Sequence, residues 1–158
     1  MRKPLINWQA LLAPSQRVIA VSLLAILASG AQAVEYRSTA RHGVIFYDTP
    51  ADTSAKRFIL SANIPLEVMN EQGEWVRVRD RDGTLSWIKK SDVSTRRFVQ
   101  VNRLSDVRQS ADSNAPTLFK VERNVLLERL DASNTGWIKV KHRDGQSGYI
   151  RIEDVWGA

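Results

Sequence analysis

The chain has 158 residues, with 23 lysines and arginines, 17 acidic residues and no cysteine. The net charge of +6 falls to +3 without the three basic residues of 1–33, and a charge this modest argues against a dedicated nucleic-acid-binding protein, whose usual signature is a concentrated basic stripe. Without cysteine the chain forms no disulfides and cannot use a cysteine nucleophile, so hydrophobic cores and hairpins alone must hold the fold.

The first 33 residues have the pattern of a signal peptide. Residues 1–17 carry three basic side chains and no acid, residues 18–28 form an apolar run, and Ala31 and Ala33 complete an A-x-A cleavage site. We therefore predict a signal helix over 1–33, cleavage after Ala33, a mature net charge of +3 and a periplasmic or secreted protein. The alternative is an uncleaved anchor, although the apolar stretch falls short of the ~20 residues that a spanning helix needs.

A tandem repeat fills the remaining chain, and it predicts two domains, 34–97 and 98–158. Matching positions differ by 62 residues: Trp75 and Trp137, Val78 and Val140, Gly83 and Gly145, Ile88 and Ile150. The joint "STRRFVQVNR" lacks the Gly/Ser/Pro composition of a flexible linker, so the halves should pack closely. Segments such as "EWVRVRD" and "LSWIKK" are rich in β-branched and aromatic residues and are bounded by turns, which predicts an all-β fold.

The loops Arg81-Asp82-Gly83 and Arg143-Asp144-Gly145 decide which face each side chain occupies. A three-residue loop with a glycine bulge brings all aliphatic side chains to one face, whereas a two-residue loop would reverse the faces. The expected inward pairs are Val76 with Ile88, Val78 with Ser86, Ile138 with Ile150, and Val140 with Gly148. The expected outward pairs are Arg77 with Trp87 and Lys139 with Tyr149.

The outward face is the candidate binding surface. Exposed Trp75 and Trp137 could stack on a sugar or proline ring, and the alternative is that they cover the rim of the core. Arg77 beside Trp87 could form a cation–π pair, for which a structural role is the alternative. Arg96 and Arg97 in the joint are a solvated pair or a contact for acidic groups.

The second repeat, "LSDVRQSADSNAPTLFKVERNVLLERLDASNTGWIKVKHRDGQSGYIRIEDV", resembles a bacterial SH3 domain (SH3b). The first repeat, ending "EWVRVRDRDGTLSWIKKSDVSTRRFV", is similar to a tandem, exported subfamily. The resemblance implies two small, partly open SH3-like barrels whose relatives mostly bind peptidoglycan or peptides. Two departures stand out. The inward Gly148 is replaced by Ser86, which then needs a hydrogen-bond partner, and the opening-motif Arg108 is replaced by Tyr47, where Tyr47 and Asp48 could build a different groove.

We find no sequence signal for catalysis. Only His42 and His142 are present, and no Ser/His/Asp arrangement or zinc-ligand set accompanies them. We therefore expect a non-catalytic monomer without cofactor or metal, without nucleic acid as a partner, and without membrane contact after cleavage. Its expected partner is peptidoglycan. The alternatives are an envelope adaptor that binds extended or proline-rich peptides, and a pair in which one unit, with the first as the suspect, only supports the other.

Overall fold

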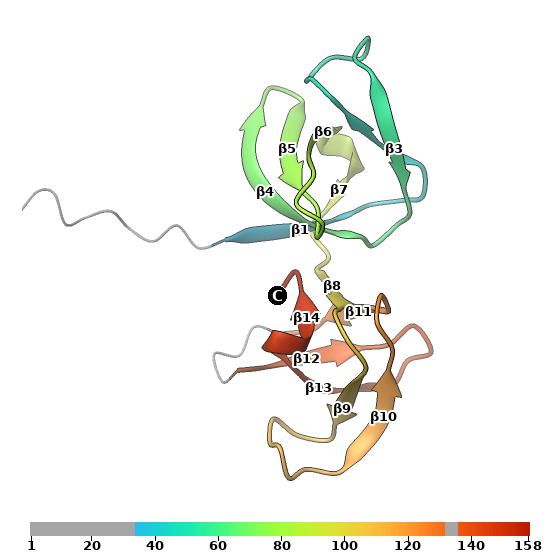
Figure 1. The fold of residues 1–158 in the computed structure, drawn as a ribbon, viewed down its shortest axis with the longest axis vertical. Helices are drawn as coiled ribbons and strands as arrows, with labels where there is room; N and C mark the ends of the chain where they lie inside the picture. Colours follow the sequence, from blue (N-terminus) through green and yellow to red (C-terminus); the bar gives the residue numbers. More distant parts are fainter. Residues whose placement is uncertain (1–33, 132–135) are drawn as a thin grey trace, which may run out of the picture. The chain divides into compact units, whose positions relative to one another are not determined.

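A computed structural model describes residues 34–131 and 136–158 (Figure 1). The predicted signal peptide, with its cleavage residues Ala31 and Ala33, lies outside these residues. Within the described ranges no helix is long and apolar enough to cross a membrane.

The first repeat forms one antiparallel sheet of seven strands, ordered β3-β2-β6-β5-β4-β1-β7. The strands are β1 (Glu35–Thr39), β2 (Val44–Tyr47), β3 (Lys56–Leu60), β4 (Pro65–Gln72), β5 (Trp75–Arg79), β6 (Leu85–Lys89) and β7 (Val93–Ser94). One 3₁₀ turn, η2 (Lys90–Asp92), connects β6 to β7.

The second repeat forms a separate sheet with the same order, β10-β9-β13-β12-β11-β8-β14. Its strands are β8 (Phe98–Val101), β9 (Ser105–Arg108), β10 (Thr117–Val121), β11 (Leu126–Arg129), β12 (Trp137–Lys141), β13 (Ser147–Arg151) and β14 (Val155–Trp156), with the 3₁₀ turn η3 (Ile152–Asp154) before β14. Two sheets of identical topology confirm the predicted duplication and the all-β class.

The hairpin register is the predicted one in both repeats. Val76 lies opposite Ile88 and Val78 opposite Ser86, and the second hairpin repeats this pairing from Ile138 to Gly148. The amide N–H groups of Asp80 and Gly83 donate to Thr84 and to Asp80, respectively, both at 3.1 Å. Gly83 has a φ of 87°, which is the left-handed conformation that a glycine bulge requires.

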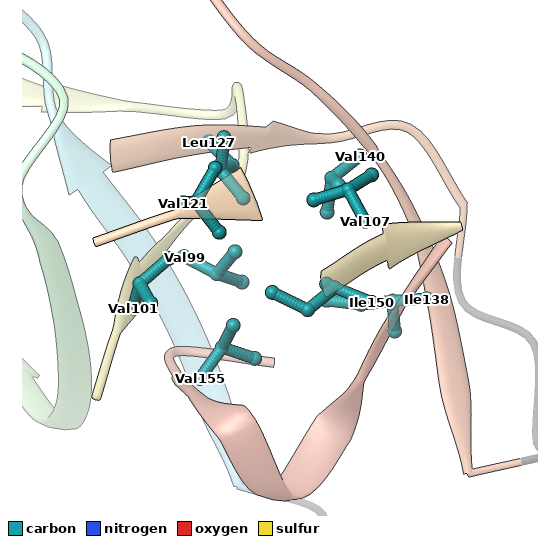
Figure 2. Close-up of a cluster of buried hydrophobic side chains, with 9 residues drawn as sticks. All are labelled: Val99, Val101, Val107, Val121, Leu127, Ile138, Val140, Ile150 and Val155. Carbon is teal, nitrogen blue, oxygen red and sulfur yellow. The ribbon is translucent and has the colours of Figure 1, made fainter. Parts of the chain in front are cut away.

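Each sheet closes around its own apolar core. Figure 2 shows the core of the second barrel, in which side chains from β8, β9, β10, β11, β12, β13 and β14 point toward one another. The corresponding cluster of the first barrel comprises Val44, Phe46, Leu66, Val76, Val78 and Ile88, all at most 1% exposed. The two cores share no residue, so each barrel has its own source of hydrophobic stabilisation.

Direct contacts join the barrels, which belong to one compact unit over residues 34–158. The backbone N–H of Phe98 donates to the Ser38 hydroxyl at 3.1 Å. The Trp156 ring packs edge-to-face on Tyr36, with centroids 5.2 Å apart. A hydrogen bond and an aromatic contact between the barrels thus support the predicted close packing of the two halves.

The inward position at the end of each hairpin differs between the repeats. A Cβ added at Gly148 would lie 2.7 Å from both the Arg108 carbonyl oxygen and the Val107 side chain. At the matching position Ser86 is 2% exposed, and its hydroxyl has no hydrogen-bond partner among the described residues. The expectation that Ser86 would find a partner is therefore wrong, and the first barrel instead tolerates a buried hydroxyl.

We predict different effects on stability from alanine at these two positions. Gly148→Ala should lower the free energy of unfolding by about 1–3 kcal/mol, because the new methyl group overpacks against backbone. Ser86→Ala should be neutral or stabilising by up to about 1 kcal/mol, because it removes a buried hydroxyl that makes no bond. Urea denaturation measures both, and equal losses in the two variants would contradict the difference in packing.

Candidate functional site

The outer face of the β5–β6 hairpin gathers aromatic and basic side chains. Arg77 and Tyr47 are the cross-strand neighbours of Trp87 on its two sides. The Arg77 guanidinium lies 6.0 Å from the Trp87 ring, as expected of a weak cation–π pair, and the Tyr47 and Trp75 rings meet edge-to-face at 5.1 Å. The structure therefore brings four predicted site residues of the first barrel together.

A cation covers one face of the Trp75 indole. The Lys89 ammonium lies 5.6 Å from the ring centroid and 2.5 Å from an Asp52 carboxylate oxygen. The hydrogen bond to Asp52 raises the pKa of Lys89 above its ordinary value, so this side chain stays charged at neutral pH. Both residues line a hollow of about 250 Å³ with Trp75, Glu74 and Ser91.

Asp48 stabilises the β2–β3 loop, which leads to this hollow. Its carboxylate pairs with Arg57, and its backbone N–H donates to Ala55 across the β2–β3 loop at 3.1 Å. These bonds hold the 48–55 loop, which carries Asp52. Asp48 thus helps to hold the loop whose Asp52 pairs with Lys89, and it does not itself line the hollow.

The matching tryptophan of the second barrel is buried. Trp137 is only 7% exposed, and the Arg151 guanidinium lies 4.8 Å from its ring centroid. Arg151 also donates to the Ser113 hydroxyl of the β9–β10 loop. The expectation that Trp137 faces solvent like Trp75 is wrong, because the indole is 7% exposed and the Arg151 guanidinium lies over it.

The remaining predicted residues of the second barrel have structural partners. Arg108 donates to the Ala115 carbonyl at 2.7 Å and pairs with Asp106 at 3.0 Å. It is the cross-strand neighbour of Tyr149, which in turn lies opposite Lys139. Arg108 therefore fastens the β9–β10 loop, while Tyr47, its counterpart in the first barrel, packs on an indole.

Sequence reasoning missed the cations that lie over the tryptophans. Lys89 and Arg151 share the 62-residue offset and follow the outward aromatic residue of each hairpin by two. Their cross-strand neighbours are Trp75 and Trp137. The offset and the register together could have identified them.

One histidine lies close to a carboxylate. His142 Nδ1 and an Asp144 oxygen are 3.0 Å apart. The hydrogen bond from the Gln146 backbone N–H lowers the pKa of Asp144 most, and the hydrogen bond from His142 lowers it further. Both residues belong to the β12–β13 turn. Across 34–131 and 136–158 no group of three or more His, Cys, Asp or Glu side chains could hold a metal ion.

The comparison with protein families agrees with this fold. The family model described as "Bacterial SH3 domain" matches residues 40–95 and again 103–157, and the chain belongs to this family. Domains of this kind are themselves non-catalytic and generally act as binding modules for cell-wall components. A comparison with curated proteins finds no match.

Three solved structures resemble the chain at low identity. NlpC2 from Trichomonas vaginalis matches at 15% identity, with 80% of this chain and 49% of that chain covered and a TM-score of 0.38. NlpC1 from Trichomonas vaginalis matches at 16% identity, with coverages of 81% and 47% and a TM-score of 0.37. An NlpC/P60 family protein from Bacillus cereus matches at 13% identity, with coverages of 77% and 56% and a TM-score of 0.34. The chain thus spans about half the length of these proteins.

We predict that Lys89 limits solvent access to Trp75 and has no effect on Trp137. In protein labelled with 5-fluorotryptophan, the solvent isotope shift of the Trp75 fluorine resonance should exceed that of Trp137, because Trp137 is nearly buried. Lys89→Ala should raise the Trp75 shift and leave the Trp137 shift unchanged. Lys56→Ala on β3 is the matched control, and an unchanged Trp75 shift in Lys89→Ala would contradict the covering role.

Proposed function

We propose that the protein is an exported, non-catalytic module that recognises peptidoglycan through the aromatic–basic face of its first barrel. The observation that carries this proposal is the hollow beside Trp75, where a partly exposed indole, an ammonium group and two carboxylates meet. An indole offers a flat apolar face and an N–H donor, which suits a sugar ring. Lys89 and Arg77 supply cations for the carboxylates of a stem peptide.

The two barrels differ in their suitability as the ligand-binding unit. Trp75 is partly exposed, while its counterpart Trp137 is 7% exposed beneath Arg151. The β2–β3 loop is held near Trp75 by an exposed ion pair, Lys89 with Asp52. Such a pair contributes about 0–1 kcal/mol, so a ligand can displace it at little cost. We therefore assign binding to the first barrel and a supporting role to the second, the reverse of the suspicion raised by the altered opening motif.

We predict that Trp75→Ala weakens binding to purified sacculi by about tenfold, since a central tryptophan of a binding site commonly contributes this much. Co-sedimentation of the purified protein with sacculi measures the effect. Lys89→Glu should also weaken binding, because it replaces the cation on the rim of the hollow with an anion and leaves the hydrophobic core unchanged.

Phe58→Ala is the matched control for this experiment. Phe58 is an exposed aromatic residue on β3 of the same barrel, 53% exposed, and it does not line the Trp75 hollow. Retention of wild-type binding by Trp75→Ala and Lys89→Glu would contradict the assigned residues. Wild-type binding no greater than that of an unrelated protein would reject peptidoglycan as the ligand.

A second candidate function is an envelope adaptor for extended peptides. β3 lies at the edge of its sheet and pairs only with β2. Its Phe58 and Ile59 side chains are 53% and 76% exposed. An edge strand with apolar side chains suits strand addition by a peptide, and this reading gains if sacculi do not bind.

Export also belongs to the proposal. When the full chain of 17.8 kDa is expressed in a bacterium, we predict that the mature protein begins at Val34, because a signal peptidase cleaves after the Ala31-Gln32-Ala33 motif. Intact mass measurement of the envelope fraction tests this. A protein that still contains residues 1–33 would contradict cleavage and favour the anchor.

A further inference from the structure

A second cavity lies at the junction of the barrels, apart from the Trp75 hollow. It measures about 610 Å³, and its lining includes Arg96 from the joint, strand residues of the second barrel and Asn63 from the β3–β4 turn of the first. Of its lining residues, Lys141 shares the outward face of β12 with Trp137 and Lys139, whereas none lines the Trp75 hollow.

A cross-strand row forms one wall of this junction cavity. Phe98 on β8 pairs with Glu128 on β11, and Glu128 pairs with Lys141 on β12. Residues directly opposite one another on antiparallel strands share a face, so these three side chains point the same way. Arg96 lies over the Phe98 ring at 5.2 Å and pairs with Glu128 at 2.9 Å.

The junction cavity has a surplus of positive charge. Arg96 already neutralises Glu128, the one carboxylate in the lining. Lys141 and Arg143 are exposed, and neither forms an ion pair with any acid of the described ranges. His142 is paired with Asp144. Two cations therefore face a hollow without a counter-charge, which favours an anionic ligand.

A hydrogen bond from the first barrel holds another lining residue of the junction cavity, Asn124. Asn124 adopts the left-handed conformation, with φ 72°, at the turn before β11. Its side-chain oxygen accepts a hydrogen bond from Arg81 of the first hairpin at 2.9 Å. Both barrels therefore build the cavity, because Arg81 of the first barrel holds Asn124 in the lining.

We propose that the junction cavity binds an acidic peptide segment of a protein partner. Lys141 and Arg143 would receive its carboxylates, and the half-buried Val125 and Leu126 would pack against an apolar side chain between them. This apolar part favours a peptide over a phosphate polymer, which offers no side chain to bury. The proposal does not depend on sugar binding at Trp75.

Fluorescence anisotropy of the purified protein with labelled hexapeptides tests this proposal. The probes are a peptide with leucine flanked by glutamates, the same peptide with glutamines, and the same peptide with lysines. We expect binding of the glutamate peptide only, weakened by added salt. The double variant K141Q/R143Q should bind it about tenfold or more weakly, as expected for the loss of charge-assisted contacts.

K56Q/K120Q is the matched control, since it removes two exposed lysines from β3 and β10, outside the junction cavity. It should retain wild-type affinity, and circular dichroism verifies that both double variants are folded. Equal binding of all three peptides, equal losses in the two double variants, or tighter binding of a polyphosphate of matched charge would each overturn the proposal. Trp75→Ala should bind the glutamate peptide normally, which separates this site from the proposed function.

Discussion

The three-residue loops of the β5–β6 and β12–β13 hairpins determine which side chains enter the cores and which face outward. A strand alternates its side chains between two faces, so one residue more or less in the loop exchanges those faces. Glycine in the left-handed conformation, at φ 87° for Gly83 and 98° for Gly145, permits the bulge that sets this parity. Val76 and Val78 consequently enter a core, while Trp75 and Arg77 face outward.

Duplication has preserved this scaffold and changed its surface. In the second barrel Arg108 fastens the loop after β9 through the Ala115 carbonyl, and a second arginine covers Trp137. In the first barrel Tyr47 replaces that fastening arginine and packs on Trp75 instead. The same topology thus supports a partly exposed indole in the first copy and, in the second, a 7% exposed indole that lines a cavity of about 350 Å³ with Arg108 and Arg151.

The sequence predicts what local geometry determines. The repeat offset, the bulged loops and the inward pairs all depend on residues a few positions apart, and the structure has them as expected. The burial of Trp137 and the unpartnered Ser86 depend on how distant loops and strands return to the hairpin. Asp52 lies in a loop with no hydrophobic periodicity, so no pattern in the sequence could indicate that it would hold Lys89 over an indole.

The Lys89–Asp52 pair bears directly on what the first barrel could select. A ring that stacks on the covered face of Trp75 must displace an ammonium that contributes about 0.5–1 kcal/mol through its cation–π contact at an exposed site. A neutral sugar would gain the indole and lose that contact. A sugar that carries a carboxylate beside its ring would instead provide the ammonium with a new partner, so the displaced cation would add to the binding. The hollow also contains Glu74, and Lys89 is the one cation among its described lining residues, so the proposed preference for an acidic glycan depends on it.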